Sequence, residues 1–439
     1  MIGAGYVEVT RASSRQFVDL MSVNDSLGVV SFGDSSIVEY PSPAGMQVIS
    51  GQAIRDAARA EIDDITFGGC TFMGAGINEA SSLLSTVSGT KAIVLLSDGY
   101  DNKGCSGDPT RPSALDAIAA LPADIPIYSC AMGPLSDQAL LEQLGTDTNG
   151  QYYFMPTIDD LFEIYNYIRG QVSGDSIIVN ESSLASSSRL AGFVDALSSE
   201  VTFSVAWNNP KLTYVPRDAK KRNEISIRLR DSRGKLLNDN DSYVRRIVGN
   251  GYVIFTITDP MPGQWFVEVS TMLRTHTRYT VGGFVNSPIR LIHKIDTEKV
   301  TAKKPFNILT SVFNGNKLVD QTRGTVQIVN QSFSTDDILR KFKRELADIK
   351  PNQLFDGDGV PKNVGKIIDL RNALIADGKK DLFEMKKANE RLKSDNNGNL
   401  NAALTLANKS TSNNLILNVS GSADGTKFIR KDLRSIFAH

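Results

Sequence analysis

The first 174 residues alternate between short apolar runs and longer segments with apolar residues on one side. Ala92–Leu96, Ile125–Met132 and Gln151–Met155 are apolar runs typical of strands buried on both faces of a parallel sheet. The other expected elements are strands at Leu27–Phe32 and Ser36–Tyr40, and helices within 6–22, 49–65, 77–87, 113–121, 138–144 and 158–172. This alternation predicts a doubly wound, Rossmann-like α/β domain over residues 1–174.

From about residue 175 the apolar residues fall at every second position, which is typical of half-buried antiparallel strands. The expected strands are Val201–Trp207, Ile225–Leu229, Val253–Ile257, Phe266–Val269, Phe306–Phe313, Gly324–Val329, Leu400–Leu406 and Leu415–Val419. Two β-sandwich domains are therefore expected, at 175–286 and 287–439, the second of immunoglobulin or fibronectin type.

Two features within these domains allow more than one interpretation. Between Thr335 and Lys393 the apolar spacing becomes helical, which predicts a helical insertion at about 335–395, either a solvated surface or a partner-binding hairpin. Trp207 and Trp265 lie within strand patterns, so packing in the core is expected rather than stacking on a carbohydrate.

Length and charge limit the classes of protein to consider. A chain of 439 residues suggests about three domains. A net charge of −1 argues against a nucleic-acid partner held by a basic field over the whole chain. No run of 18 uncharged apolar residues occurs, and no signal peptide opens the sequence.

The most informative chemistry follows the run Ala92–Leu96. Asp98 comes directly after this expected strand, at the sheet edge where open α/β folds bind ligands. Thr71 offers a hydroxyl in the glycine-rich stretch GGCT, just before a helical pattern. One carboxylate and one hydroxyl on neighbouring loops predict part of an oxygen-ligand site for Mg²⁺ or Ca²⁺, and Asp34 is a weaker candidate to border it. The simpler interpretation is a turn carboxylate and a helix cap.

The stretches TFGGCTFMGAGINEA and KAIVLLSDGYDN resemble the von Willebrand factor A domain family. The resemblance implies a metal-ion-dependent adhesion site in which Thr71 and Asp98 are metal ligands and a partner's acidic residue completes the ion's coordination. The family's Asp-x-Ser-x-Ser motif is absent, and Met1 resembles the methionine that follows it. The expectation is a chain that begins just past three ligands and the central first strand, so that it binds the ion weakly or not at all.

Two of the three cysteines are expected near the same sheet edge. Cys70 adjoins Thr71, and Cys105 follows Asp98 in the loop DNKGCSG. They could form a disulfide, which would indicate an oxidising compartment, or remain two free loop thiols. Cys130 lies in an apolar run and is expected to be a buried strand residue.

The domain order resembles the calcium-activated chloride channel regulators, which carry a zinc protease domain ahead of the A domain. No HExxH motif occurs here, and the two acidic residues Asp356 and Asp358 do not complete a calcium-binding EF-hand loop. The sequence therefore favours a non-enzymatic, extracellular or cell-surface adhesion module that binds a protein ligand presenting an acidic residue. Two alternatives stay open: an intracellular A-domain scaffold for an AAA+ ATPase, and the non-catalytic part of a larger surface protease.

Overall fold

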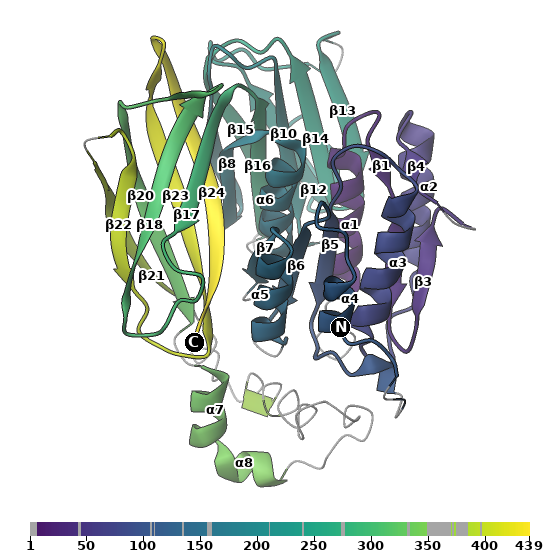
Figure 1. The fold of residues 1–439 in the computed structure, drawn as a ribbon. Helices are drawn as coiled ribbons and strands as arrows, with labels where there is room; N and C mark the ends of the chain where they lie inside the picture. Colours follow the sequence, from purple (N-terminus) through teal and green to yellow (C-terminus); the bar gives the residue numbers. More distant parts are fainter. Residues whose placement is uncertain are drawn as a thin grey trace.

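The computed structural model of the chain consists of an α/β domain and a larger region of antiparallel strands (Figure 1). The structure describes residues 7–42, 45–105, 108, 110–133, 136–155, 160–209, 211–238, 241–273, 277–331, 334–348, 370, 373–374, 385–395 and 397–439. Among these residues, no helix has the length and apolar character needed to cross a bilayer.

The α/β domain closely follows the sequence pattern. Its helices are α1 (Val7–Leu20), α2 (Gln52–Asp64), α3 (Met73–Ser85), α4 (Ala114–Ala119), α5 (Gln138–Asp147) and α6 (Leu161–Ser173), with the short 3-10 turn η2 (Lys103–Cys105). Its strands are β1 (Ser26–Leu27), β2 (Val29–Phe32), β3 (Ser36–Tyr40), β4 (Gln47–Val48), β5 (Ile93–Ser97), β6 (Ile127–Met132) and β7 (Gln151–Met155). The prediction of alternating strands and helices is confirmed.

The sheet of this domain is divided among three groups of strands. Strands β5, β6 and β7 are parallel neighbours, β2 and β3 form an antiparallel pair, and β1 pairs with β4. Side chains of α3, α4 and α5 pack on one face of β5–β7, and those of α1 and α6 pack on the other. The expected strand Leu27–Phe32 is divided at Gly28 into β1, which pairs with β4, and β2, which pairs with β3.

Ser136 lies two residues before the expected helix 138–144 and would be a suitable cap, but the structure caps α5 differently. The N-cap is Asp137, whose carboxylate accepts the Leu140 N–H at 3.2 Å. The hydroxyl of Ser136 instead donates to the carbonyl of Gly133 at 2.8 Å. An aspartate one position later can reach the same first-turn N–H groups, and it also adds a favourable charge at the helix start.

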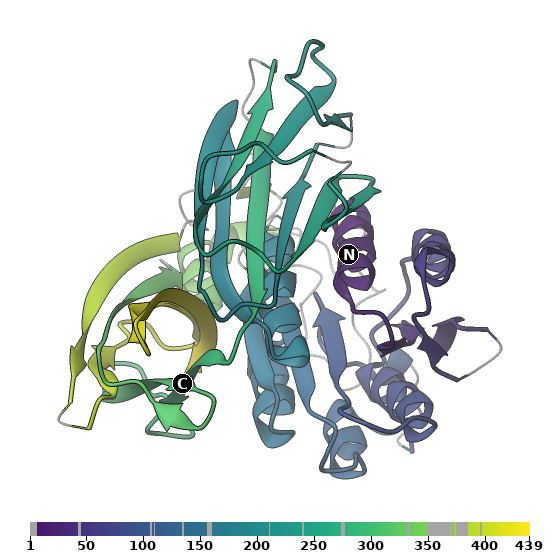
Figure 2. The ribbon, with the colours of Figure 1, turned by 90° about the horizontal axis from the view of Figure 1, so that it is seen from above.

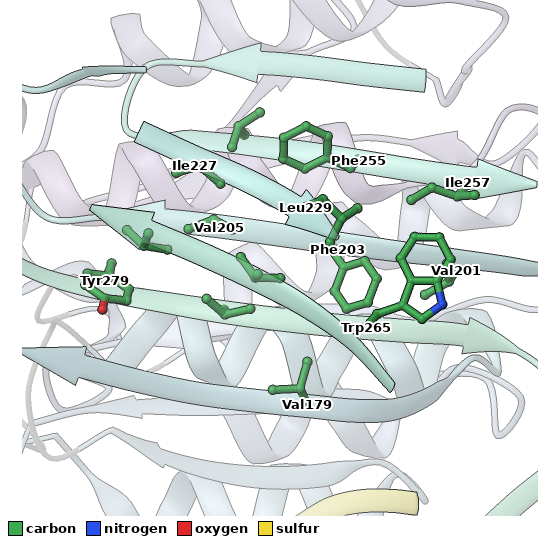
Figure 3. Close-up of a cluster of buried hydrophobic side chains, with 14 of the residues drawn as sticks. Val179, Val201, Phe203, Val205, Ile227, Leu229, Phe255, Ile257, Trp265 and Tyr279 are labelled. Carbon is green, nitrogen blue, oxygen red and sulfur yellow. The ribbon is translucent and has the colours of Figure 1, made fainter. Parts of the chain in front are cut away.

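The first sandwich packs two sheets face to face. One sheet contains β8 (Ser176–Ala185), β10 (Glu200–Trp207), β13 (Val244–Gly249), β14 (Tyr252–Thr258) and β16 (Thr277–Asn286). The other sheet contains β9 (Ser187–Val194), β11 (Thr213–Val215), β12 (Glu224–Arg230) and β15 (Gly263–Thr271). Figure 3 shows the core between them, where Trp265 stacks on Phe203 with ring centroids 6.1 Å apart. Trp265 is 1 % exposed and Trp207 is 3 % exposed, so neither ring offers a surface for a sugar.

The second sandwich contains β17 (Ile289–Ile295), β18 (Pro305–Asn314), β19 (Lys317–Leu318), β20 (Thr322–Gln331), β21 (Met385–Ser394), β22 (Leu400–Thr405), β23 (Thr411–Ala423) and β24 (Thr426–Ala438). Its core includes Phe306, Val326, Leu417 and Phe428. Strand β24 also pairs with β8 through Lys431 and Ile177, which makes one sheet continuous across both sandwiches.

The predicted helical insertion is only partly correct. Helices α7 (Thr335–Lys341) and α8 (Lys343–Asp348) lie within it, but Met385–Ser394 is the strand β21 and not a helix. This segment pairs with β20 and then with β22, and such tertiary pairing overrides a weak helical spacing. Asp356 and Asp358 lie outside the described residues.

The α/β domain shares a core with both sandwiches. Helix α6 packs against side chains of β14, β16 and β24, including Ile254, Phe284 and Leu433. In the view from above, the α/β domain, the first sandwich and the second sandwich lie side by side around this contact (Figure 2). Side chains of β23 and β24 cover the exposed edge of β7, because Ser435 accepts the Phe154 N–H and Asn414 donates to its carbonyl, both at 3.0 Å.

Candidate functional site

The candidate site lies where β5 ends. The side chains of β5 alternate between buried and half-buried positions, and Asp98 follows directly after Ser97, half-buried. Because β5 runs parallel to β6 and β7, the residue after it lies at the carboxyl edge of these strands. Asp98 therefore lies at the sheet edge where the sequence places it, and its role as a metal ligand stays a prediction.

The threonine loop is attached to the loop that carries Asp98. The Thr71 N–H donates to the side-chain oxygen of Asn102 at 2.7 Å, and the Asn102 N–H donates to the Thr71 carbonyl at 2.9 Å. A Cβ atom on Gly99 would lie 3.0 Å from Thr71 Oγ1, so the absence of a side chain at Gly99 leaves room for this close approach. The hydroxyl of Thr71 thus lies beside the residue that follows Asp98.

The alternative role for Thr71, as a helix cap, is not observed. The N-cap of α3 is Phe72, and no side chain caps that helix end. Thr71 is half-buried and lies one residue before the cap. Its hydroxyl is therefore not used to satisfy the first turn of α3.

A third oxygen-bearing side chain borders this edge, as expected from the sequence. The exposed carboxylate of Asp34 accepts the Cys70 N–H at 2.8 Å. Gly69 has a φ of 75°, and a Cβ atom there would lie 2.7 Å from Asp34 Oδ1. The loop after β2 is thereby bound to the threonine loop.

Sequence reasoning missed two further carboxylates at this edge. Asp101 accepts the Ala114 N–H at 2.7 Å, and the Asp137 N–H donates to the Gly99 carbonyl at 3.3 Å. Burial raises the pKa of Asp137 above its ordinary value, and the nearby charge of Asp101 raises it further. The signal was available, because Asp101 is in the same DGYDN stretch as Asp98.

We call the side chains of Thr71, Asp34, Asp98, Asp101 and Asp137 the acidic edge. They carry hard oxygen atoms, which is the donor type that Mg²⁺ and Ca²⁺ prefer. Within the described residues, no group of three or more His, Cys, Asp or Glu side chains is close enough to hold a metal ion. The oxygen atoms on these neighbouring loops are therefore one hydroxyl and separate carboxylates.

The cysteines differ in state. Cys70 is disulfide-bonded, whereas Cys130 is a buried free thiol whose pKa is raised by burial. The side chain of Cys105 lies outside the described part of the chain, so the Cys70–Cys105 pairing stays a prediction.

The two histidines that the structure describes have structural surroundings. His293 Nδ1 lies 3.1 Å from a carboxylate oxygen of Asp432, and both side chains are buried. His439 Nε2 lies 3.1 Å from a carboxylate oxygen of Glu142. The first contact lies between two strands of the second sandwich, and the second attaches the end of the chain to α5.

Residues 2–166 match the profile of the von Willebrand factor type A domain. The chain therefore contains a von Willebrand factor type A domain. Proteins with this A domain commonly use it to bind other proteins. The relationship to calcium-activated chloride channel regulators and the absence of a first ligand motif stay predictions.

Solved structures with a similar arrangement include a von Willebrand factor type A protein from Catenulispora acidiphila and the ArnB paralog VWA2 from Sulfolobus acidocaldarius. The first is 13 % identical, with a TM-score of 0.36, over 71 % of this chain and 59 % of that one. The second is 11 % identical, with a TM-score of 0.30, over 71 % and 58 %. The chain thus spans about six-tenths of each, and likeness at this level carries no argument about function. No curated protein matches the chain.

Proposed function

We propose that this chain is a non-enzymatic binding protein that uses the acidic edge of its A domain to capture a protein partner. In this proposal Thr71 and Asp98 supply two oxygen ligands to a Mg²⁺ or Ca²⁺ ion, and the partner supplies an acidic side chain. The observation that carries the proposal is the pair of hydrogen bonds between Thr71 and Asn102, which fixes the threonine loop beside the Asp98 loop.

The chemistry of the edge supports a cation. Hydroxyl and carboxylate oxygens suit hard divalent ions, and the carboxylates of Asp34, Asp101 and Asp137 add negative potential around Asp98. When bound, the ion would supply a positive charge to which a partner carboxylate can attach. The A domain's own residues would position the ion and the partner through the bound loops.

We further propose that the protein works outside the cytoplasm, on the cell surface or beyond it. The disulfide at Cys70 supports this location, because disulfides persist mainly in oxidising compartments. The two sandwiches share a core with the A domain and would hold its acidic edge in one orientation. Counting free thiols in unreduced protein from its native source tests this: three free thiols would favour the intracellular scaffold instead.

The cation site can be tested by titrating the chain with Mn²⁺, followed by calorimetry and by the electron paramagnetic resonance of free Mn²⁺. We expect binding no tighter than on the order of millimolar, because the proposed site has only two ligands from the chain, Thr71 and Asp98. Asp98→Ala should weaken this binding at least tenfold. Asp124→Ala is the matched control, because Asp124 is an exposed carboxylate before β6, at the opposite edge of the sheet.

An equal loss of Mn²⁺ affinity in Asp98→Ala and Asp124→Ala would show that Mn²⁺ binds only through general surface charge, and would overturn the proposal. Micromolar affinity in the unaltered chain would mean that its ligands are not those proposed. Thermal unfolding of Asp98→Ala should match that of the unaltered protein, because the proposal gives Asp98 a binding role and not a structural one.

A further inference from the structure

One sheet face of the second sandwich carries only basic charge. Opposed residues of antiparallel strands point to the same face, and Arg391, Thr325, Asn418 and Lys431 form one such row across β21, β20, β23 and β24. We call this side the basic face. Its charged residues, at alternating positions of the four strands, are Arg323, Lys387, Arg391, Lys393, Lys427 and Lys431. No Asp or Glu occupies the alternating positions of the described residues on this side.

Part of the basic face is covered by the A domain. Leu433 joins the core beneath α6, and Asn414 and Ser435 bind the backbone of Phe154. The remaining part, around Arg323 and Arg391, continues beyond the A domain. We call it the free part of the basic face; its exposed cations are Arg323, Arg391, Lys393 and Lys427.

The cations of the free part have no carboxylate partners among the described residues. Lys431 pairs with Glu181 at 2.5 Å, and the charge of Lys387 acts on Glu163. By contrast, the contact recorded for Arg323 is a long hydrogen bond of 3.4 Å to the hydroxyl of Ser420. Because the whole chain has a net charge of −1, this positive charge is a local feature of the surface.

The surroundings of these cations select among anionic partners. Alternate residues of a strand are about 7 Å apart and neighbouring strands about 4.8 Å apart, so the cations form a spaced array. The side chains between them are Thr325, Asn418 and Ser420, which bind hydroxyl groups through hydrogen bonds. A regular polymer with both hydroxyl groups and charges is complementary to such an array.

Other partners fit less well. The rows through Thr325 and Arg323 contain no aromatic side chain, so unpaired nucleic-acid bases have no platform on which to stack. Their apolar content is limited to the half-buried Ile429, too little to insert into a membrane surface. An added peptide strand would bind at the edge of β21, in the plane of the sheet, and not on the sheet face that carries these cations.

We propose that the free part of the basic face binds a linear anionic polysaccharide. The guanidinium groups of Arg323 and Arg391 would pair with successive acidic groups of the polymer, and Thr325, Asn418 and Ser420 with its hydroxyl groups. This role is independent of the cation edge of the A domain. It would place the protein on an acidic glycan while the A domain is engaged elsewhere.

The test measures binding of the full chain to alginate, a polymer of uronic acids, at low salt by calorimetry. Dextran serves as the neutral polysaccharide, and poly-glutamate and duplex DNA as other polyanions. The variant replaces Arg323, Arg391 and Lys393 together by Gln. A matched control replaces the exposed Lys220, Lys221 and Arg222 of the first sandwich by Gln, which changes the net charge by the same amount.

We expect alginate binding that disappears at high salt, no binding of dextran, at least a tenfold loss in the Arg323/Arg391/Lys393 variant, and less than a twofold change in the control. Circular dichroism should show the same fold in both variants, since all six side chains are exposed. Absence of alginate binding, equal loss in both variants, or tighter binding of poly-glutamate or DNA than of alginate would each overturn the proposal.

Discussion

The buried ion pair between Arg430 and Asp195 allows a quantitative test of how the two sandwiches are held together. Both side chains are 0 % exposed, and a guanidinium nitrogen of Arg430 lies 2.6 Å from Asp195 Oδ2. Arg430 also donates to the Ile289 carbonyl at 2.8 Å and to the Ser287 hydroxyl at 3.0 Å. Asp195 accepts the hydroxyl of Ser198 at 3.0 Å. The pair therefore connects β24 to the loop after β9 and to the segment between the sandwiches.

Replacing Asp195 by Leu leaves the guanidinium buried without its counter-charge. The cost of breaking such a pair by removing one partner is about 3–5 kcal/mol. The free energy of unfolding of a domain is about 5–15 kcal/mol, so the loss would be a large fraction of the total. Replacing Arg430 by Met at the same time removes the unpaired charge, and we expect the double variant to be within about 1 kcal/mol of the unaltered protein.

The measurement is equilibrium unfolding in urea, followed by two signals. The chain has two tryptophans, Trp207 and Trp265, and both lie in the core of the first sandwich. Their fluorescence reports that sandwich, whereas far-ultraviolet circular dichroism reports all the strands. Separation of the two transitions in the Asp195→Leu variant would show that the first sandwich unfolds independently once the pair is broken.

An exposed pair provides the control. Lys317 and Asp424 are 78 % and 63 % exposed and 3.7 Å apart, so Asp424→Leu should cost less than about 1 kcal/mol. The reasoning is refuted if Asp195→Leu costs no more than Asp424→Leu. It is refuted equally if the double variant is as unstable as the single one, because the loss would then come from packing and not from the unpaired charge.

Three further predictions concern buried groups. Burial, with the nearby charge of Asp160, raises the pKa of Glu163 to about 7 from an ordinary 4.5. The carboxyl therefore ionises at lower pH in the unfolded chain, and the free energy of unfolding should fall by up to about 3 kcal/mol as the pH rises from 4.5 to 7. Urea unfolding of Glu163→Gln should lack this fall, and the control Glu298→Gln should retain it. Tyr252→Phe should cost about 1–2 kcal/mol, because the hydroxyl donates to the buried carboxylate of Asp19 at 2.5 Å; an unchanged urea midpoint would contradict this. Ser435→Ala removes the acceptor of the Phe154 N–H on the edge of β7. We expect it to lower the free energy of unfolding by about 1–3 kcal/mol and to speed hydrogen exchange at the Phe154 amide.

The spacing of apolar residues along the chain was sufficient to predict many of the helices and strands of the A domain. The segment Gln151–Met155 is a strand with the predicted bounds, and α1 and α6 lie within one to three residues of theirs, because apolar periodicity reflects burial on one side of an element. Asp98 could be placed because the ends of parallel strands share an edge, and Thr71 through the glycine-rich loop that resembles the A-domain family. Asp137 and Asp101 were missed as members of that edge because their positions depend on hydrogen bonds to Gly99 and Ala114.

Pattern failed where long-range pairing decides the conformation. Met385–Ser394 has most of its side chains exposed and little apolar content, so it carries no strong strand signal. It becomes β21 by pairing with β20 over Met385–Leu392 and with β22 at Lys393 and Ser394. Strand β24 was also missed, although it connects the two sandwiches, because its buried Arg430 and Asp432 give it a mixed pattern. Charged residues of this kind are buried only when distant partners satisfy them.

The sequence alone was enough to predict the alternation of strands and helices in the A domain, the family of that domain, and the position of Asp98 directly after β5. Only the tertiary structure decided that the threonine loop binds the Asp98 loop, that the A domain shares a core with both sandwiches, and that six cations share one sheet face. The physical reason is that periodicity along the chain specifies which sides are buried. Which other helix or strand covers a buried side depends on strand register and on packing between residues far apart in sequence.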